Sequence, residues 1–169
     1  AECRPSQGYT ADGLLDVLYG AIAAAEIKAH MPIEEVFESW LYDMLDYTED
    51  FESLSAAAKE ELLSALEEAD YTEADFYDIY VELAGLAVIH TAGDFTVIRD
   101  YILKNSERLG VDLDDYTALS GYRQDLIMQD VFAERQTISS LSQIPSIFDE
   151  AVDNQKSSVN TGNIGGGGG

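Results

Sequence analysis

The chain has 169 residues, of which 33 are acidic and 9 basic, and its formal net charge at pH 7 is −24. Such an acid excess disfavours binding to nucleic acid or anionic membranes and favours basic protein surfaces as partners. Apolar residues make up 46% of the chain and aromatic residues 10%, which predicts a folded core, while the single cysteine excludes an internal disulfide.

The first half of the chain is predicted to hold a short N-terminal arm, residues 1–10, followed by four helices. Apolar side chains recur at helical spacing in each of them, and Pro32 at a first-turn position opens the second. The four predicted segments cover residues 11–30, 32–45, 53–69 and 72–91.

Two local patterns refine these helices. Gly20 and several alanines make the first helix narrow, which predicts that another helix approaches it closely. Thr72 is interpreted as a helix N-cap, and the preceding Tyr71 is expected to pack onto Phe76.

The second half is predicted to contain a helix that begins after the N-cap Asp94 and ends near Gly110. Asp112 caps a sixth element that is broken at Gly121 and reaches about residue 141. The helical bundle is thus placed at residues 11–144, followed by a short amphipathic piece and an extended tail at 145–169.

The predicted fold class is all-α: a compact bundle of five to seven helices with an extended, irregular, Gly-rich C-terminal tail. The core is expected to contain residues from every apolar stripe. The predicted core residues are Leu18, Ile22, Trp40, Leu41, Leu66, Leu83, Ile98, Leu126 and Phe132.

The polar tail is expected to lack regular structure from about Asp153 and to pack on a neighbouring subunit, because Asn, Ser and Gly cannot build a core. The last apolar group before it is Ile147, Phe148 and Val152, which is predicted to anchor the tail.

The acids concentrate in the first 100 residues, which carry 23 acidic and 4 basic side chains. Acids on the second to fourth helices are expected to face solvent without a basic partner and to form a partner-binding surface whose binding weakens with salt. This surface comprises Glu34, Glu35, Glu38, Glu60, Glu61, Glu67 and Glu68.

No pattern for catalysis, cofactor binding or metal binding is complete in the sequence. His30 follows Glu26 by four residues and His90 lies on an apolar stripe, so both are interpreted as core or capping histidines. Zinc, calcium, phosphate-loop and serine-nucleophile patterns lack required residues. The sequence therefore predicts a protein that is not an enzyme, with no cofactor and no metal.

Three functional hypotheses follow. The first is a non-enzymatic structural subunit of a larger assembly, a homo-oligomer within a bacteriophage virion as a neck, head-to-tail adaptor or capsid-associated protein. The second is an acidic DNA mimic of the anti-restriction, anti-CRISPR or immunity type that blocks a basic partner. The third is a helical domain adapted to high salt. Location in a virion or host cytoplasm is expected, without a signal peptide or membrane span.

Overall fold

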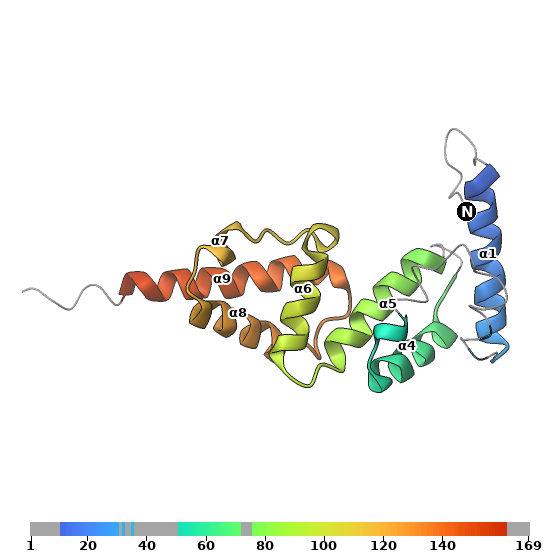
Figure 1. Cartoon of the computed structure of the whole chain (residues 1–169), viewed down its shortest axis with the longest axis horizontal. Coiled ribbons are helices and arrows are strands. Elements are labelled where there is room, and N and C mark those ends of the chain that lie inside the picture. Colours follow the sequence, from blue (N-terminus) through green and yellow to red (C-terminus); the bar gives the residue numbers. More distant parts are fainter. Residues whose placement is uncertain (1–10, 31, 33–34, 36–50, 72–75, 162–169) are drawn as a thin grey trace, which may run out of the picture. The chain divides into compact units, whose positions relative to one another are not determined.

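The computed structural model describes residues 11–30, 32, 35, 51–71 and 76–161 (Figure 1). In these residues the regular structure is helical, with seven α-helices and one 3₁₀ turn, which confirms the all-α class. The N-terminal arm, most of the predicted second helix and the last eight residues lie outside the described residues.

The chain divides into two compact units, residues 1–87 and 88–169, each with its own core. The helical pattern predicted one bundle, and the division into two units is a finding of the structure.

The first unit contains α1 (Ala11–Lys28), α4 (Ala56–Glu68) and most of α5 (Phe76–His90). Its core is built mainly from small and aliphatic residues of α1 and α4 with aromatic residues around them. The buried cluster consists of Ala23, Ala24, Ile27, Phe51, Ala58, Leu62, Leu66, Phe76, Tyr80 and Ala87.

Two predicted contacts in this unit are confirmed. A Cβ atom at Gly20 would lie 3.0 Å from the Cβ of Phe76, so α1 does allow the close approach that its glycine predicted. The ring of Tyr71 stacks on that of Phe76 with their centroids 6.0 Å apart, as expected of a residue that staples the start of α5.

The second unit contains α6 (Phe95–Leu109), α7 (Asp114–Thr117), α8 (Gly121–Glu134), the 3₁₀ turn η1 (Leu141–Gln143) and α9 (Ile144–Thr161). Helix α8 packs against both α6 and α9, and α8 and α9 lie side by side in Figure 1. The core between these helices includes Ile98, Ile102, Ile127, Met128, Val131, Ile144, Phe148 and Val152.

Both ends of α6 follow the predicted caps, whereas the N-cap of α7 is Leu113 and not the predicted Asp112, whose Oδ1 accepts the Asp114 backbone N–H at 2.9 Å. The Asp94 carboxylate accepts a hydrogen bond from the Thr96 backbone N–H at 2.8 Å and caps α6. Gly110 ends α6 with a φ of 72°, a left-handed conformation that glycine adopts without strain. The predicted break at Gly121 separates α7 from α8, but α8 ends at Glu134 and not near residue 141.

The predicted start of the irregular tail is wrong, because α9 continues without a break to Thr161. Contacts from other helices hold the polar segment: Lys156 Nζ donates a hydrogen bond to Asp115 Oδ2 at 2.7 Å, and Arg123 donates to the Gln155 carbonyl oxygen. Tertiary contacts thus outweigh the weak helix propensity of this segment.

The core prediction is only partly confirmed. Leu66 and Ile98 are fully buried, whereas Leu18 is 53% exposed. Leu18 lies on the opposite side of α1 from Ala23 and Ile27, the residues that face the core. The other described candidates, Ile22, Leu83, Leu126 and Phe132, are half-buried, and Trp40 and Leu41 lie outside the described residues.

Candidate functional site

The described part of the predicted acidic surface centres on α4. Ser55 begins this helix by accepting the backbone N–H of Ala58 at 3.1 Å, and Leu62 and Leu66 turn one face into the core. The opposite face carries carboxylates because the helical period places them about half a turn away. We call this surface the α4 acidic face; it consists of Glu60, Glu67 and Glu68, all exposed.

The remaining predicted acids have different surroundings. Glu35 is exposed, whereas Glu61 is half-buried and engaged in an interaction of its own. Glu34 and Glu38 lie outside the described residues. The structure thus brings three of the seven predicted acids together on one helix face.

The two described bases of the first unit, Lys28 and Lys59, are occupied elsewhere. Lys59 Nζ lies 3.5 Å from Glu52 Oε2 and 4.7 Å from the centroid of the Phe51 ring. Lys28 Nζ lies 5.2 Å from the centroid of the Tyr71 ring. Within the described residues, no Lys or Arg forms an ion pair with the α4 acidic face.

His30 touches this face, at a place that the sequence did not predict. Its Nδ1 lies 3.3 Å from Glu67 Oε1 on α4, and both side chains are largely exposed. His30 also follows the end of α1 with a φ of 59°, the left-handed conformation that often terminates a helix. Its position therefore serves the turn after α1, in agreement with a capping interpretation.

His90 has a structural environment in the second unit. Its Nε2 lies 2.8 Å from the Ile138 carbonyl oxygen, and the side-chain amide of Gln136 donates to the His90 carbonyl oxygen at 2.8 Å. These bonds hold the end of α5 against the segment after α8: the Gln136 side chain caps the His90 carbonyl oxygen, and the His90 imidazole contacts the backbone at Ile138.

Burial changes the titration of one residue beside the first core. Partial burial raises the pKa of Tyr71 to about 12, and its hydroxyl donates a hydrogen bond to the Leu66 carbonyl oxygen at 2.7 Å. Ionisation would place a negative charge in this apolar surrounding next to a carbonyl oxygen. Tyr71 is therefore held as a neutral donor that ties the end of α4.

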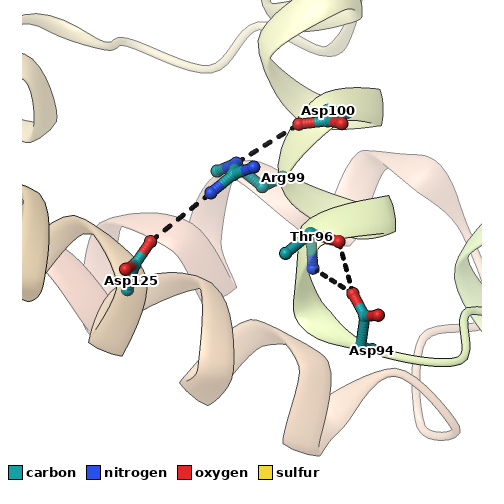
Figure 2. A network of polar contacts seen from close by, with 5 residues as sticks. All are labelled: Asp94, Thr96, Arg99, Asp100 and Asp125. Atoms are coloured by element: carbon teal, nitrogen blue, oxygen red, sulfur yellow. Dashed lines mark hydrogen bonds and ion pairs between the residues drawn. The ribbon is translucent and has the colours of Figure 1, made fainter.

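One network of charged groups in the second unit links α6 to α8. Figure 2 shows Arg99 of α6, whose Nε lies 3.2 Å from Asp100 Oδ1 and whose Nη1 lies 3.5 Å from Asp125 Oδ1 on α8. Hydrogen bonds from the Thr96 hydroxyl and backbone N–H lower the pKa of Asp94 in the same region. These groups support the fold of the unit rather than an open charged surface.

The predicted tail anchor is largely internal. Phe148 and Val152 are buried in the second unit, and the Phe148 ring centroid lies 5.5 Å from that of Tyr116. Ile147 is half-buried and lines a groove between α8 and α9 that the sequence pattern did not predict. Whether these residues hold the tail on a neighbouring subunit stays a prediction, since residues 162–169 lie outside the described residues.

No group of three His, Cys, Asp or Glu side chains among the described residues could hold a metal ion. None of the helices described is long and apolar enough to cross a bilayer. Comparison of this chain with protein-family models, curated proteins and solved structures finds no match.

Proposed function

We propose that this chain is a non-enzymatic structural subunit of a larger assembly and binds a basic surface of another subunit through the α4 acidic face. The observation that carries the proposal is that the described basic side chains all have partners within the chain, whereas some exposed carboxylates have no described basic partner. Every Lys and Arg among the described residues has an intramolecular partner. Glu60 and Glu68 face solvent without a described basic partner.

A partner protein with clustered Lys or Arg residues would form ion pairs with these carboxylates. Exposed charge pairs contribute about 0.2–1 kcal/mol each, so pairs at Glu60 and Glu68 supply roughly 0.4–2 kcal/mol. Their larger effect is on the rate of encounter, because residues 1–87 carry 21 acids and 3 bases, a net charge of −18. The acidic face would thus select and orient a partner whose affinity comes mostly from other contacts.

A bacteriophage virion is the assembly we favour, with the chain as a neck, head-to-tail adaptor or capsid-associated protein present in several copies. The helical build and the acidic surface support this assignment, by analogy of general construction with such proteins.

The second candidate is a DNA mimic that occupies the basic groove of a nucleic-acid enzyme. The exposed row of carboxylates along α4 favours it, since residues 60 to 68 span about 12 Å of helix axis. Duplex DNA carries one charge per about 1.7 Å of axis, so the α4 acidic face has a much lower charge density. For this reason the mimic ranks below the structural subunit.

Native mass spectrometry of the complex purified from its source, before and after addition of duplex DNA, separates these functions. A structural subunit is expected in a complex of defined stoichiometry that survives excess duplex DNA. Release of the chain by DNA from a DNA-binding enzyme would support the mimic and contradict the structural proposal. A monomer in the native extract would contradict both.

A further inference from the structure

A groove runs along the surface where α8 and α9 pack together, with a volume of about 450 Å³. From α8 it is lined by Asp130, Ala133 and Glu134, which share one helix face at spacings of three and four. From α9 it is lined by Ile147, Glu150, Ala151 and Asn154, again one face of the helix. The groove lies entirely within the second unit and is separate from the α4 acidic face.

The groove has an apolar floor and an acidic rim. Ala151 is buried and Ile147 half-buried, and the alanines of the two helices leave room above them for a bulky apolar side chain. Asp130, Glu134 and Glu150 are all exposed. No described Lys or Arg forms an ion pair with these three carboxylates, because the bases of this unit are engaged with other groups.

We propose that this groove is a docking site for a basic amphipathic helix of a partner protein. A helix suits the site because Ile147 and Asn154 are seven residues apart, so the groove extends along about 10 Å, or two helical turns. One apolar side chain of the partner fills the space over Ala133 and Ala151. Lys or Arg residues one turn to either side lie beside Asp130 and Glu150.

The rim and floor have different functions in this arrangement. The carboxylates attract the basic helix and set its orientation, while the apolar contact excludes water and fixes its register. A purely charged partner would gain only the weak attraction of exposed ion pairs. Selectivity for an amphipathic helix over any basic segment therefore depends on both features together.

The probe is a synthetic 15-residue helical peptide rich in alanine, with a central Leu flanked by Lys at positions three and four residues away on each side. It is titrated into the full ¹⁵N-labelled chain at low salt, and its affinity and the shifted amides are measured by NMR. We expect the shifts to concentrate on α8 and α9. The same peptide with Ser in place of Leu should bind at least about tenfold more weakly.

Paired variants distinguish the groove from general acidity. Asp130→Asn with Glu150→Gln should weaken the peptide about tenfold or more, whereas Glu107→Gln with Asp149→Asn, which removes the same charge outside the groove, should change affinity less than about twofold. Glu134 is left intact because its carboxylate accepts a hydrogen bond from Thr137. Ala133→Trp, which fills the groove without changing charge, should abolish binding while far-UV circular dichroism stays unchanged.

Three results would overturn the proposal: no binding of the peptide, equal binding of the Ser peptide, or equal loss from the two charge pairs. None of these bears on the α4 acidic face, so the failure of this inference leaves the proposed structural role to its own test.

Discussion

Tyr71 connects three parts of the first unit at the scale of a single residue. It donates a hydrogen bond to the end of α4, stacks on Phe76 of α5 and lies under the ammonium group of Lys28. Partial burial of the phenol disfavours its charged form, which is why the pKa of Tyr71 is raised.

Titration of Tyr71 gives the first prediction. Because the folded pKa of about 12 lies above the usual value of 10.0, Tyr71 contributes stability that is complete below pH 10 and is lost as the pH rises towards 12. Absorbance at 295 nm should show one tyrosinate that forms near pH 12 in the wild type and is absent in Tyr71→Phe. Identical titration curves for the two proteins would contradict the assignment.

His30 gives a second prediction at this scale. With a φ of 59° it occupies a conformation in which glycine is favoured, so His30→Gly should stabilise the first unit by about 0.5–1 kcal/mol. Urea unfolding followed by hydrogen exchange of the buried amides of α4 measures this change. A loss of stability would mean that the contact with Glu67 outweighs the backbone strain.

These residues show which local features a sequence can predict. The contact of Tyr71 with Phe76 joins neighbours at a helix start and follows from their spacing. The contact of His30 with Glu67 joins residues 37 positions apart, and the turn at the end of α1 creates it. The sequence spacing indicated Glu26 as the neighbour of His30, because helical periodicity relates only residues of the same helix.

Helix α9 shows the same distinction at the scale of an element. Composition predicted an irregular tail from Asp153, since Asn, Ser and Gln are poor or average helix formers. The helix persists to Thr161 because Lys156 pairs with Asp115, and that carboxylate raises the pKa of Lys156 by accepting its hydrogen bond. Composition carries no information on such partners.

The length of α9 makes a third prediction. Deleting residues 162–169 removes no described contact and should leave the thermal stability of the second unit nearly unchanged. Deleting residues 153–169 also removes the hydrogen bonds to Asp115 and Arg123. This deletion should lower the thermal unfolding midpoint by several degrees, which is the effect of a loss of about 1 kcal/mol in a unit of this size. Differential scanning calorimetry compares the two truncations, and equal midpoints would contradict the role of residues 153–161.

At the scale of the whole chain, the two units differ most in charge. Residues 1–87 carry a net charge of −18, whereas residues 88–169 carry 12 acids and 6 bases, a net charge of −6. Composition and periodicity predicted the all-α class. The division into units and the groove between α8 and α9 depend on tertiary packing, which helical periodicity within a segment does not specify.

This asymmetry gives a fourth prediction. Self-repulsion should destabilise the first unit more than the second at low salt, and screening should relieve it. Between 20 and 500 mM NaCl, the urea midpoint from hydrogen exchange of buried amides on α4 should rise more than that from buried amides on α8. Equal shifts of the two urea midpoints would show that the acid excess does not destabilise the first unit more than the second.

The central claim, that the α4 acidic face binds a basic partner, is tested most directly by the dissociation constant of the partner purified with this chain. Isothermal titration calorimetry compares the wild type with two variants of equal charge: Glu60→Gln, Glu67→Gln, Glu68→Gln, and the control Glu107→Gln, Asp149→Asn, Asp153→Asn. We expect the first to weaken binding about tenfold or more at 50 mM salt, and the control less than about threefold. Equal weakening by both variants, or none by the first, would contradict the claim.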